Sequence, residues 1–110
     1  MDERLARLRA FGFVTYEQYL RSEIWLARRS RALQVSGWVC FCCEDTDQLD
    51  VHHITYQRLC QERPEDLVVL CRYCHRAAHR LPGDPATAHL RLRDRMRGAQ
   101  DHQPPRQTTL

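Results

Sequence analysis

Four cysteines in two C-x2-C pairs are the first residues in this chain whose type and spacing could bind a metal ion. Cys40 pairs with Cys43, and Cys71 pairs with Cys74. A tight C-x2-C turn can point both sulfur atoms at one ion, and two such turns complete the tetrahedral S4 shell that zinc favours. The spacing therefore predicts a structural zinc site.

A disulfide framework is the alternative reading of the same cysteines. The first residues, MDERLARLRA, are charged and show no apolar signal segment, and no run of 18 apolar residues could cross a membrane. We therefore expect a cytoplasmic protein without a membrane partner, in which cysteines stay reduced or bind metal. Cys42 could replace Cys40 or Cys43 only with poorer spacing. Cys42 and Cys60 are expected to be buried small residues or free thiols.

Two pairs of histidines lie close to the cysteine pairs in the sequence. His75 and His79 are four residues apart, so a helix would place them on one face. His52 and His53 are adjacent in LDVHHITY, residues 49–56, which alternates as a strand does. Neighbouring strand side chains diverge, so one histidine could bind a metal while the other stays free as a base.

The elements that must position these residues can be read from capping residues and apolar periodicity. Thr15 and Ser22 can each cap a helix, and Gly37 can end one. The expected helices are residues 2–11, 16–20, 22–35, 72–80 and 86–98, and the expected strands are residues 49–54 and 67–70.

One small α+β domain is the expected fold class. A chain of 110 residues has a limited core, which a metal staple would help to stabilise. We divide it into an N-terminal helical lead-in (1–37), a core with both cysteine pairs (38–81), a basic helix or extension (82–98) and a disordered tail (99–110).

Charge is unevenly distributed along the chain, although the net charge is only +3. Residues 1–39 hold seven arginines against four acids, residues 40–66 hold two against seven, and residues 72–97 hold seven against two. All 17 basic residues are arginine, which suits bidentate contact with phosphate, although such a bias can also reflect genomic base composition. The alternative is that these charges form an ordinary solvated surface.

Taken together, the motifs CFCC, LDVHHITY, PEDLVVLC and CRYCHRAAH resemble the HNH endonuclease family, in its zinc-containing branch of the four-cysteine type. The resemblance covers residues 16–80 and implies a ββα-metal core, stapled by zinc and preceded by N-terminal helices. It implies that His52 is a metal ligand, that His53 is the general base and that His79 closes the motif. His75 matches a further metal ligand of the colicin-nuclease-like members.

Asp66 departs from the family pattern, which has asparagine at that place; this chain contains no asparagine. An ionised aspartate only accepts hydrogen bonds. Asp66 could accept one from His53, fix its tautomer and raise its basicity, and Glu65 could share that role. Alternatively, Asp66 is a loop residue and the base is held by other groups.

The function implied by the resemblance is metal-dependent hydrolysis of DNA phosphodiester bonds, by nicking or by double-strand cutting. His53 would take a proton from water, and a divalent ion on His52, His79 and His75 would stabilise the developing charge. Imidazole ligands suit Mn, Co, Ni or Zn better than Mg. DNA phosphates would contact arginines such as Arg72, Arg76 and Arg80.

Two alternatives remain open from the sequence. The chain could be a zinc-finger-like DNA-binding module without chemistry, whose histidines are surface or core residues. It could also be a nuclease that acts only with a protein partner. A second, displaceable metal ion would separate the nuclease from the binding module, because a binding module needs only the structural ion.

Overall fold

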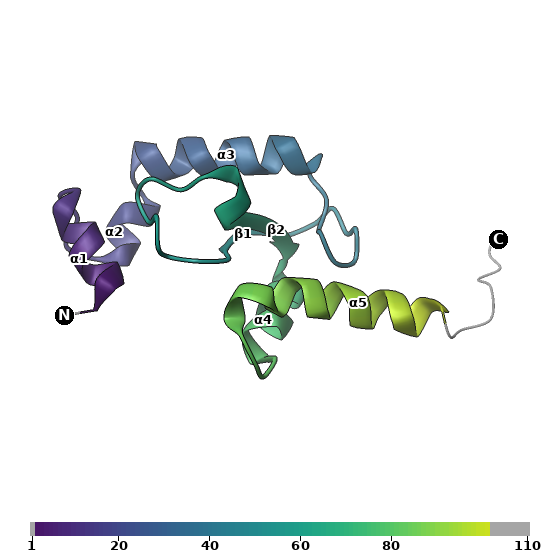
Figure 1. Cartoon of the computed structure of the whole chain (residues 1–110). Coiled ribbons are helices and arrows are strands. Elements are labelled where there is room, and N and C mark those ends of the chain that lie inside the picture. The colour runs from purple at the N-terminus through teal and green to yellow at the C-terminus, as the bar shows by residue number, and fades with distance from the viewer. Residues whose placement is uncertain (1, 102–110) are drawn as a thin grey trace.

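The computed structural model describes residues 2–101 as helices arranged around one two-stranded antiparallel sheet (Figure 1). In chain order, its main elements are α1 (Glu3–Ala10), α2 (Tyr16–Leu20), α3 (Glu23–Ser36), β1 (Leu49–His53), β2 (Leu67–Cys71), α4 (Arg72–Arg80) and α5 (Ala88–Asp101). Short 3-10 helices, η1 (Pro64–Asp66) and η2 (Pro85–Thr87), precede β2 and α5. The expected small α+β class is confirmed.

The N-terminal helices begin and end at the residues that the sequence indicated. The Thr15 side chain accepts a hydrogen bond from the Gln18 amide, and the Ser22 side chain accepts one from the Trp25 amide. Each bond satisfies an amide that has no partner inside its helix. Gly37 follows α3 at a φ of 73°, a left-handed conformation that glycine adopts with little strain.

The register of the sheet sends the two adjacent histidines to opposite faces. β1 and β2 pair so that His52 lies opposite Val68 and His53 lies opposite Leu67. α4 then follows β2 without an intervening residue. Because side chains alternate along a strand, only one of the two histidines can face α4.

Two hydrophobic clusters make up the core. The first surrounds the cysteines with residues of α4 and α5, and contains Cys40, Cys42, Leu70, Cys71, Cys74, Ala78, Ala88 and Leu92. The second joins the N-terminal helices to the loop after β1, and contains Leu8, Tyr19, Trp25, Leu59 and Cys60. Cys42 and Cys60 are therefore buried free cysteines, as expected.

The C-terminal part differs from expectation at its boundary. α5 runs to Asp101, three residues past the expected end at residue 98. The remainder of the expected disordered tail, residues 102–110, lies outside the described residues. None of the helices within residues 2–101 is long and apolar enough to span a membrane.

Candidate functional site

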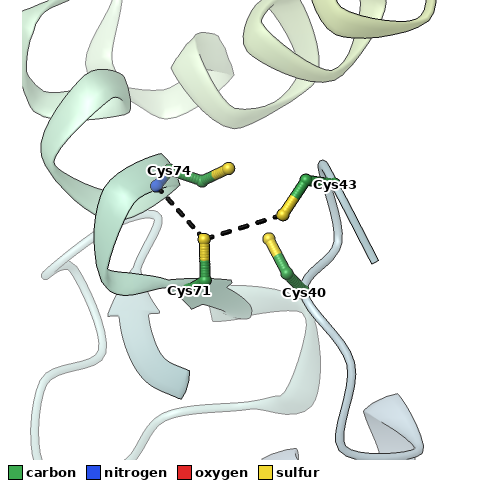
Figure 2. Close-up of side chains that lie close together, drawn as sticks. All are labelled: Cys40, Cys43, Cys71 and Cys74. Atoms are coloured by element: carbon green, nitrogen blue, oxygen red, sulfur yellow. Dashed lines mark hydrogen bonds between the residues drawn. The ribbon is translucent and has the colours of Figure 1, made fainter. Parts of the chain in front are cut away.

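The four cysteines of the two C-x2-C pairs meet in space. Their sulfur atoms all lie within 4.8 Å of one another, and Figure 2 shows them converging from the loop after α3 and from the β2–α4 junction. Cys43 Sγ lies 3.7 Å from Cys71 Sγ. Cys40, Cys71 and Cys74 are buried, whereas Cys43 is partly exposed. The group is close enough to bind a metal ion.

Backbone amides support this cysteine group. The amide of Cys42 lies 3.4 Å from Cys40 Sγ, and the amide of Cys74 lies 3.4 Å from Cys71 Sγ. The pKa of Cys40 is lowered to about 3, first by a hydrogen bond from the Cys42 thiol and also by nearby backbone amides. Burial raises the pKa of Cys74, because it disfavours the charged thiolate. In addition, four crowded thiols cannot all ionise without a cation. An S4 donor set of this kind suits zinc.

A second possible metal-binding group consists of three histidines. Ring nitrogens of His52 on β1 and of His75 and His79 on α4 all lie within 4.8 Å of one another. His75 Nε2 is 3.2 Å from His79 Nε2. His52 is buried and His79 is exposed, so the group reaches from the sheet to the surface. The structure thus brings together the three histidines that the resemblance named as metal ligands.

The pKa values of His52 and His79 are lowered, which favours the neutral imidazoles that bind metal ions. The pKa of His52 is lowered to about 3, mainly by burial and also by His75 and His79. Burial and His75 lower the pKa of His79 as well. His75 Nδ1 lies 3.0 Å from Asp50 Oδ2 and donates to this carboxylate, so Nε2, which lies 3.2 Å from His79 Nε2, is the nitrogen that could bind an ion. Asp50 was not singled out from the sequence, although it lies two residues before His52 on the same strand face.

His53 lies apart from both groups, in the second hydrophobic cluster. Its Nδ1 lies 3.0 Å from the Tyr16 hydroxyl, and its Nε2 lies 2.7 Å from Glu62 Oε2. The ring stacks between Trp25 and Tyr56, with centroid distances of 4.7 and 5.2 Å. Only 1% of its side chain is exposed. Both ring nitrogens are therefore engaged by the protein.

Glu62 is the buried carboxylate that holds His53. It also accepts a hydrogen bond from the Tyr19 hydroxyl at 2.6 Å and lies 3.3 Å from Arg28 Nε. Burial alone would raise the pKa of Glu62, but hydrogen bonds from His53 and Tyr19 lower it overall. The ionised carboxylate accepts from Nε2–H of His53, which leaves Nδ1 to accept from Tyr16. The sequence reasoning missed Glu62, because nothing local separates it from the other acids of its loop.

Asp66 does not take the place beside His53 that we expected for it. Its carboxylate contacts the Arg58 guanidinium, with Nε to Oδ2 at 2.8 Å, and accepts from the Arg63 amide at 2.9 Å. The hydrogen bond from Arg58 is the main reason that the pKa of Asp66 is lowered. Glu65 is exposed. The geometry fits the alternative, in which Asp66 bridges its loop and another group holds the histidine.

The arginines expected to contact DNA lie along the exposed side of α4. Arg72, Arg76 and Arg80 recur every four residues and line a shallow depression of about 620 Å³ together with Tyr73. The same helix carries His75 and His79, so cations and imidazoles share one short element. Arg72 also lies 3.7 Å from Asp50.

Comparisons with protein families, with curated proteins and with solved structures find no match to this chain. The structure itself defines a small α+β protein with a two-stranded antiparallel sheet. Its four-cysteine group lies close enough to bind a metal ion, which suggests structural zinc.

Proposed function

We propose that this chain is a metal-dependent endonuclease of the HNH type, with a ββα-metal core, that hydrolyses DNA phosphodiester bonds. The observation that carries the proposal is the group of three histidines where β1 meets α4. Three imidazoles that reach the surface suit a divalent ion with open positions for water and phosphate. The four-cysteine group supports it, because zinc there would anchor the start of the helix that carries two of the imidazoles.

His52, His75 and His79 would hold the divalent ion, which could be Mn, Co, Ni, Zn or Mg. Bound there, the ion would stabilise negative charge on the phosphoryl oxygens and on the leaving oxygen. Asp50 fixes the tautomer and orientation of His75 through its Nδ1–H. Exposed arginines on the same helix would contact DNA phosphates without reading the sequence.

His53 is the proposed general base, with Nδ1 as the atom that accepts the proton. Glu62 accepts from Nε2–H, so Nδ1 is the nitrogen whose lone pair can accept a proton. Because Nδ1 accepts from the Tyr16 hydroxyl, this hydroxyl must either relay the proton or move aside for water. In this scheme Glu62 takes the orienting role that the sequence had suggested for Asp66.

One observation favours a second candidate, a zinc-finger-like DNA-binding module without chemistry. The His53 side chain is buried and both of its nitrogens have protein partners. A histidine placed in this way can serve stability alone. In this alternative the α4 arginines would still bind DNA.

Cleavage of supercoiled plasmid across Mn, Co, Ni, Zn and Mg tests the proposal. The nuclease should convert the plasmid to nicked or linear DNA with at least one of these ions. His52→Ala and His79→Ala should lose this activity while they keep the zinc of the cysteine group. If no ion supports cleavage and the protein still shifts DNA in a gel, the binding module is the correct function.

A further inference from the structure

A groove runs between α3, β2 and α5, apart from both groups of candidate metal ligands except for Cys40 at its base. Its volume is about 710 Å³. Figure 1 shows α3 and α5 running lengthwise on opposite sides of the sheet region. Strand residues Leu67, Val68 and Val69 line the groove between the two helices. The groove thus has α3 on one side and α5 on the other.

The side of α3 that faces the groove is an apolar stripe distinct from its buried side. α3 buries Trp25 and Leu33 in the protein. Ile24, Ala27 and Val35 line the groove from a different face, which also carries Arg28 and Arg31. Ile24 is 44% exposed and Val35 is 70% exposed, so this stripe has no cover within the described residues. Exposed apolar surface gathered in a groove is typical of a binding site.

Arginines lie around these apolar residues of the groove. Arg28, Arg31, Arg63, Arg93 and Arg97 line the groove, against two acids, Glu44 and Glu62. Glu62 is buried and already paired with Arg28 and His53. Within residues 2–98, neither Arg31 nor Arg97 forms an ion pair. The groove therefore carries uncompensated positive charge from α3 on one side and from α5 on the other.

We propose that this groove binds an acidic amphipathic helix of a partner protein. The aliphatic residues that line the groove would contact leucine or isoleucine side chains of the partner helix. The arginines would pair with carboxylates that flank these side chains. α3 has 14 residues and is about 21 Å long, so a partner helix of similar length can lie along it.

A nucleic acid strand is a poorer occupant of the groove than a helix. Bases bind single-strand grooves by stacking on open aromatic faces. Phe41 is the aromatic residue that lines this groove, and the Arg93 guanidinium already covers its ring at 4.3 Å from the centroid. The other apolar residues that line the groove are aliphatic, so bases find no stacking partner among them. This inference does not depend on the nuclease proposal.

The test uses two fluorescent 16-residue peptides with the same leucine stripe at helical spacing. One carries glutamate at the flanking positions and the other carries lysine. Fluorescence anisotropy with the zinc-loaded full chain should show that the glutamate peptide binds at least about tenfold more tightly, because only its charges complement the arginines. Equal affinity for the two peptides would overturn the proposal.

Variants locate the binding. Val35→Asp should lower the affinity for the glutamate peptide at least about tenfold, whereas Leu26→Asp should leave this affinity unchanged. Leu26 is the matched control, since it is also an exposed apolar residue of α3, at 50% exposure, but does not line the groove. The double variant Arg31→Glu, Arg97→Glu should reverse the preference and bind the lysine peptide. Zinc content and circular dichroism confirm that each variant is folded.

Three results would replace the proposal with another occupant or none. If a single-stranded oligonucleotide displaces the peptide and the double variant loses oligonucleotide binding, the groove binds nucleic acid. If sedimentation shows a dimer that Val35→Asp dissociates, a second copy of the chain fills the groove. If Leu26→Asp lowers the peptide affinity as much as Val35→Asp does, the peptide binds by non-specific contact with α3.

Discussion

His53 Nε2 lies 2.7 Å from Glu62 Oε2, and neither side chain is appreciably exposed to solvent. This pair joins β1 to the loop before η1, and through Tyr19 and Arg28 it connects that loop to α2 and α3. A buried carboxylate is stable only when its hydrogen bonds are complete. The pair therefore matters for folding whether or not His53 takes part in a reaction.

Glu62→Gln should destabilise the protein by about 3 kcal/mol, because it removes a buried carboxylate that accepts hydrogen bonds from His53 and Tyr19. Urea unfolding of the zinc-loaded protein measures the change. Glu65→Gln, at an exposed acid nearby, is the control and should change stability by less than about 0.5 kcal/mol. Equal stabilities of the two variants would mean that the buried pair contributes little.

Cys71→Ser should prevent folding rather than merely weaken it. The residue belongs to the four-cysteine group, and structural zinc supplies on the order of 10 kcal/mol of folding free energy. Zinc content by mass spectrometry and far-UV circular dichroism measure the two effects. Cys60→Ser is the matched control, since Cys60 is buried but lies outside the group, and it should keep its zinc. A folded Cys71→Ser protein with full zinc content would contradict the assignment.

Local patterns in the sequence were sufficient to predict most elements and the residues of both groups that could bind a metal ion. The C-x2-C spacing and the four-residue spacing of His75 and His79 are set within a few residues, so they survive folding unchanged. The helix 72–80 was predicted to the residue. The end of α5 was misplaced: the helix continues past Gly98, a residue type that often ends helices, to Asp101.

The partner of His53 could not be predicted, because it depends on packing between distant segments. Register places Leu67 opposite His53, and the Asp66 carbonyl accepts from the Ile54 amide. Asp66 is therefore adjacent to the histidine strand by its backbone, as the sequence suggested. Its side chain turns back to Arg58, and Glu62 reaches His53 from within the loop.

Under the proposed function, His52→Ala and His79→Ala should weaken binding of the second metal ion, whereas His53→Ala should still bind it. His52 and His79 belong to the three-histidine group, whereas both ring nitrogens of His53 contact other residues, Tyr16 and Glu62. Calorimetric titration of the zinc-loaded protein separates the cases. Under the proposed function, His53→Ala should nevertheless lower the cleavage rate by a factor of about 10²–10⁴. Loss of the second ion in His53→Ala but not in His52→Ala would reverse the two roles.

Under the proposed function, Arg76→Ala and Arg80→Ala should each weaken DNA binding, by about the same factor for every DNA sequence. If each arginine contacts one phosphate, the slope of log K against log salt should fall by about 0.9 for each substitution. Fluorescence anisotropy with two unrelated duplexes at several salt concentrations measures both effects. Arg21→Ala, at an exposed arginine after α2, is the control and should leave the slope unchanged. A slope that stays constant in the α4 variants would exclude this surface.

Asp66→Asn should lower stability at neutral pH by about 1.5 kcal/mol, the usual lower value for hydrogen bonds to a charged group. The bond from Arg58 holds the pKa of Asp66 below its ordinary value of 3.8. Because the folded pKa is lower than the unfolded one, ionised Asp66 stabilises the fold above pH 3.8, and this contribution is lost as the pH falls through the folded pKa.

Urea unfolding of wild type and Asp66→Asn between pH 7 and pH 3 measures this contribution as the difference between the two proteins. Both chains keep the same four cysteines, so acid loss of zinc affects both and cancels in the difference. The difference should be constant above about pH 5 and shrink below pH 3.8. Under the proposed function, the pH dependence of plasmid cleavage should be the same in both proteins, because Asp66 contacts Arg58 and not His53. A cleavage profile that shifts in Asp66→Asn would instead restore Asp66 as the residue that orients the base.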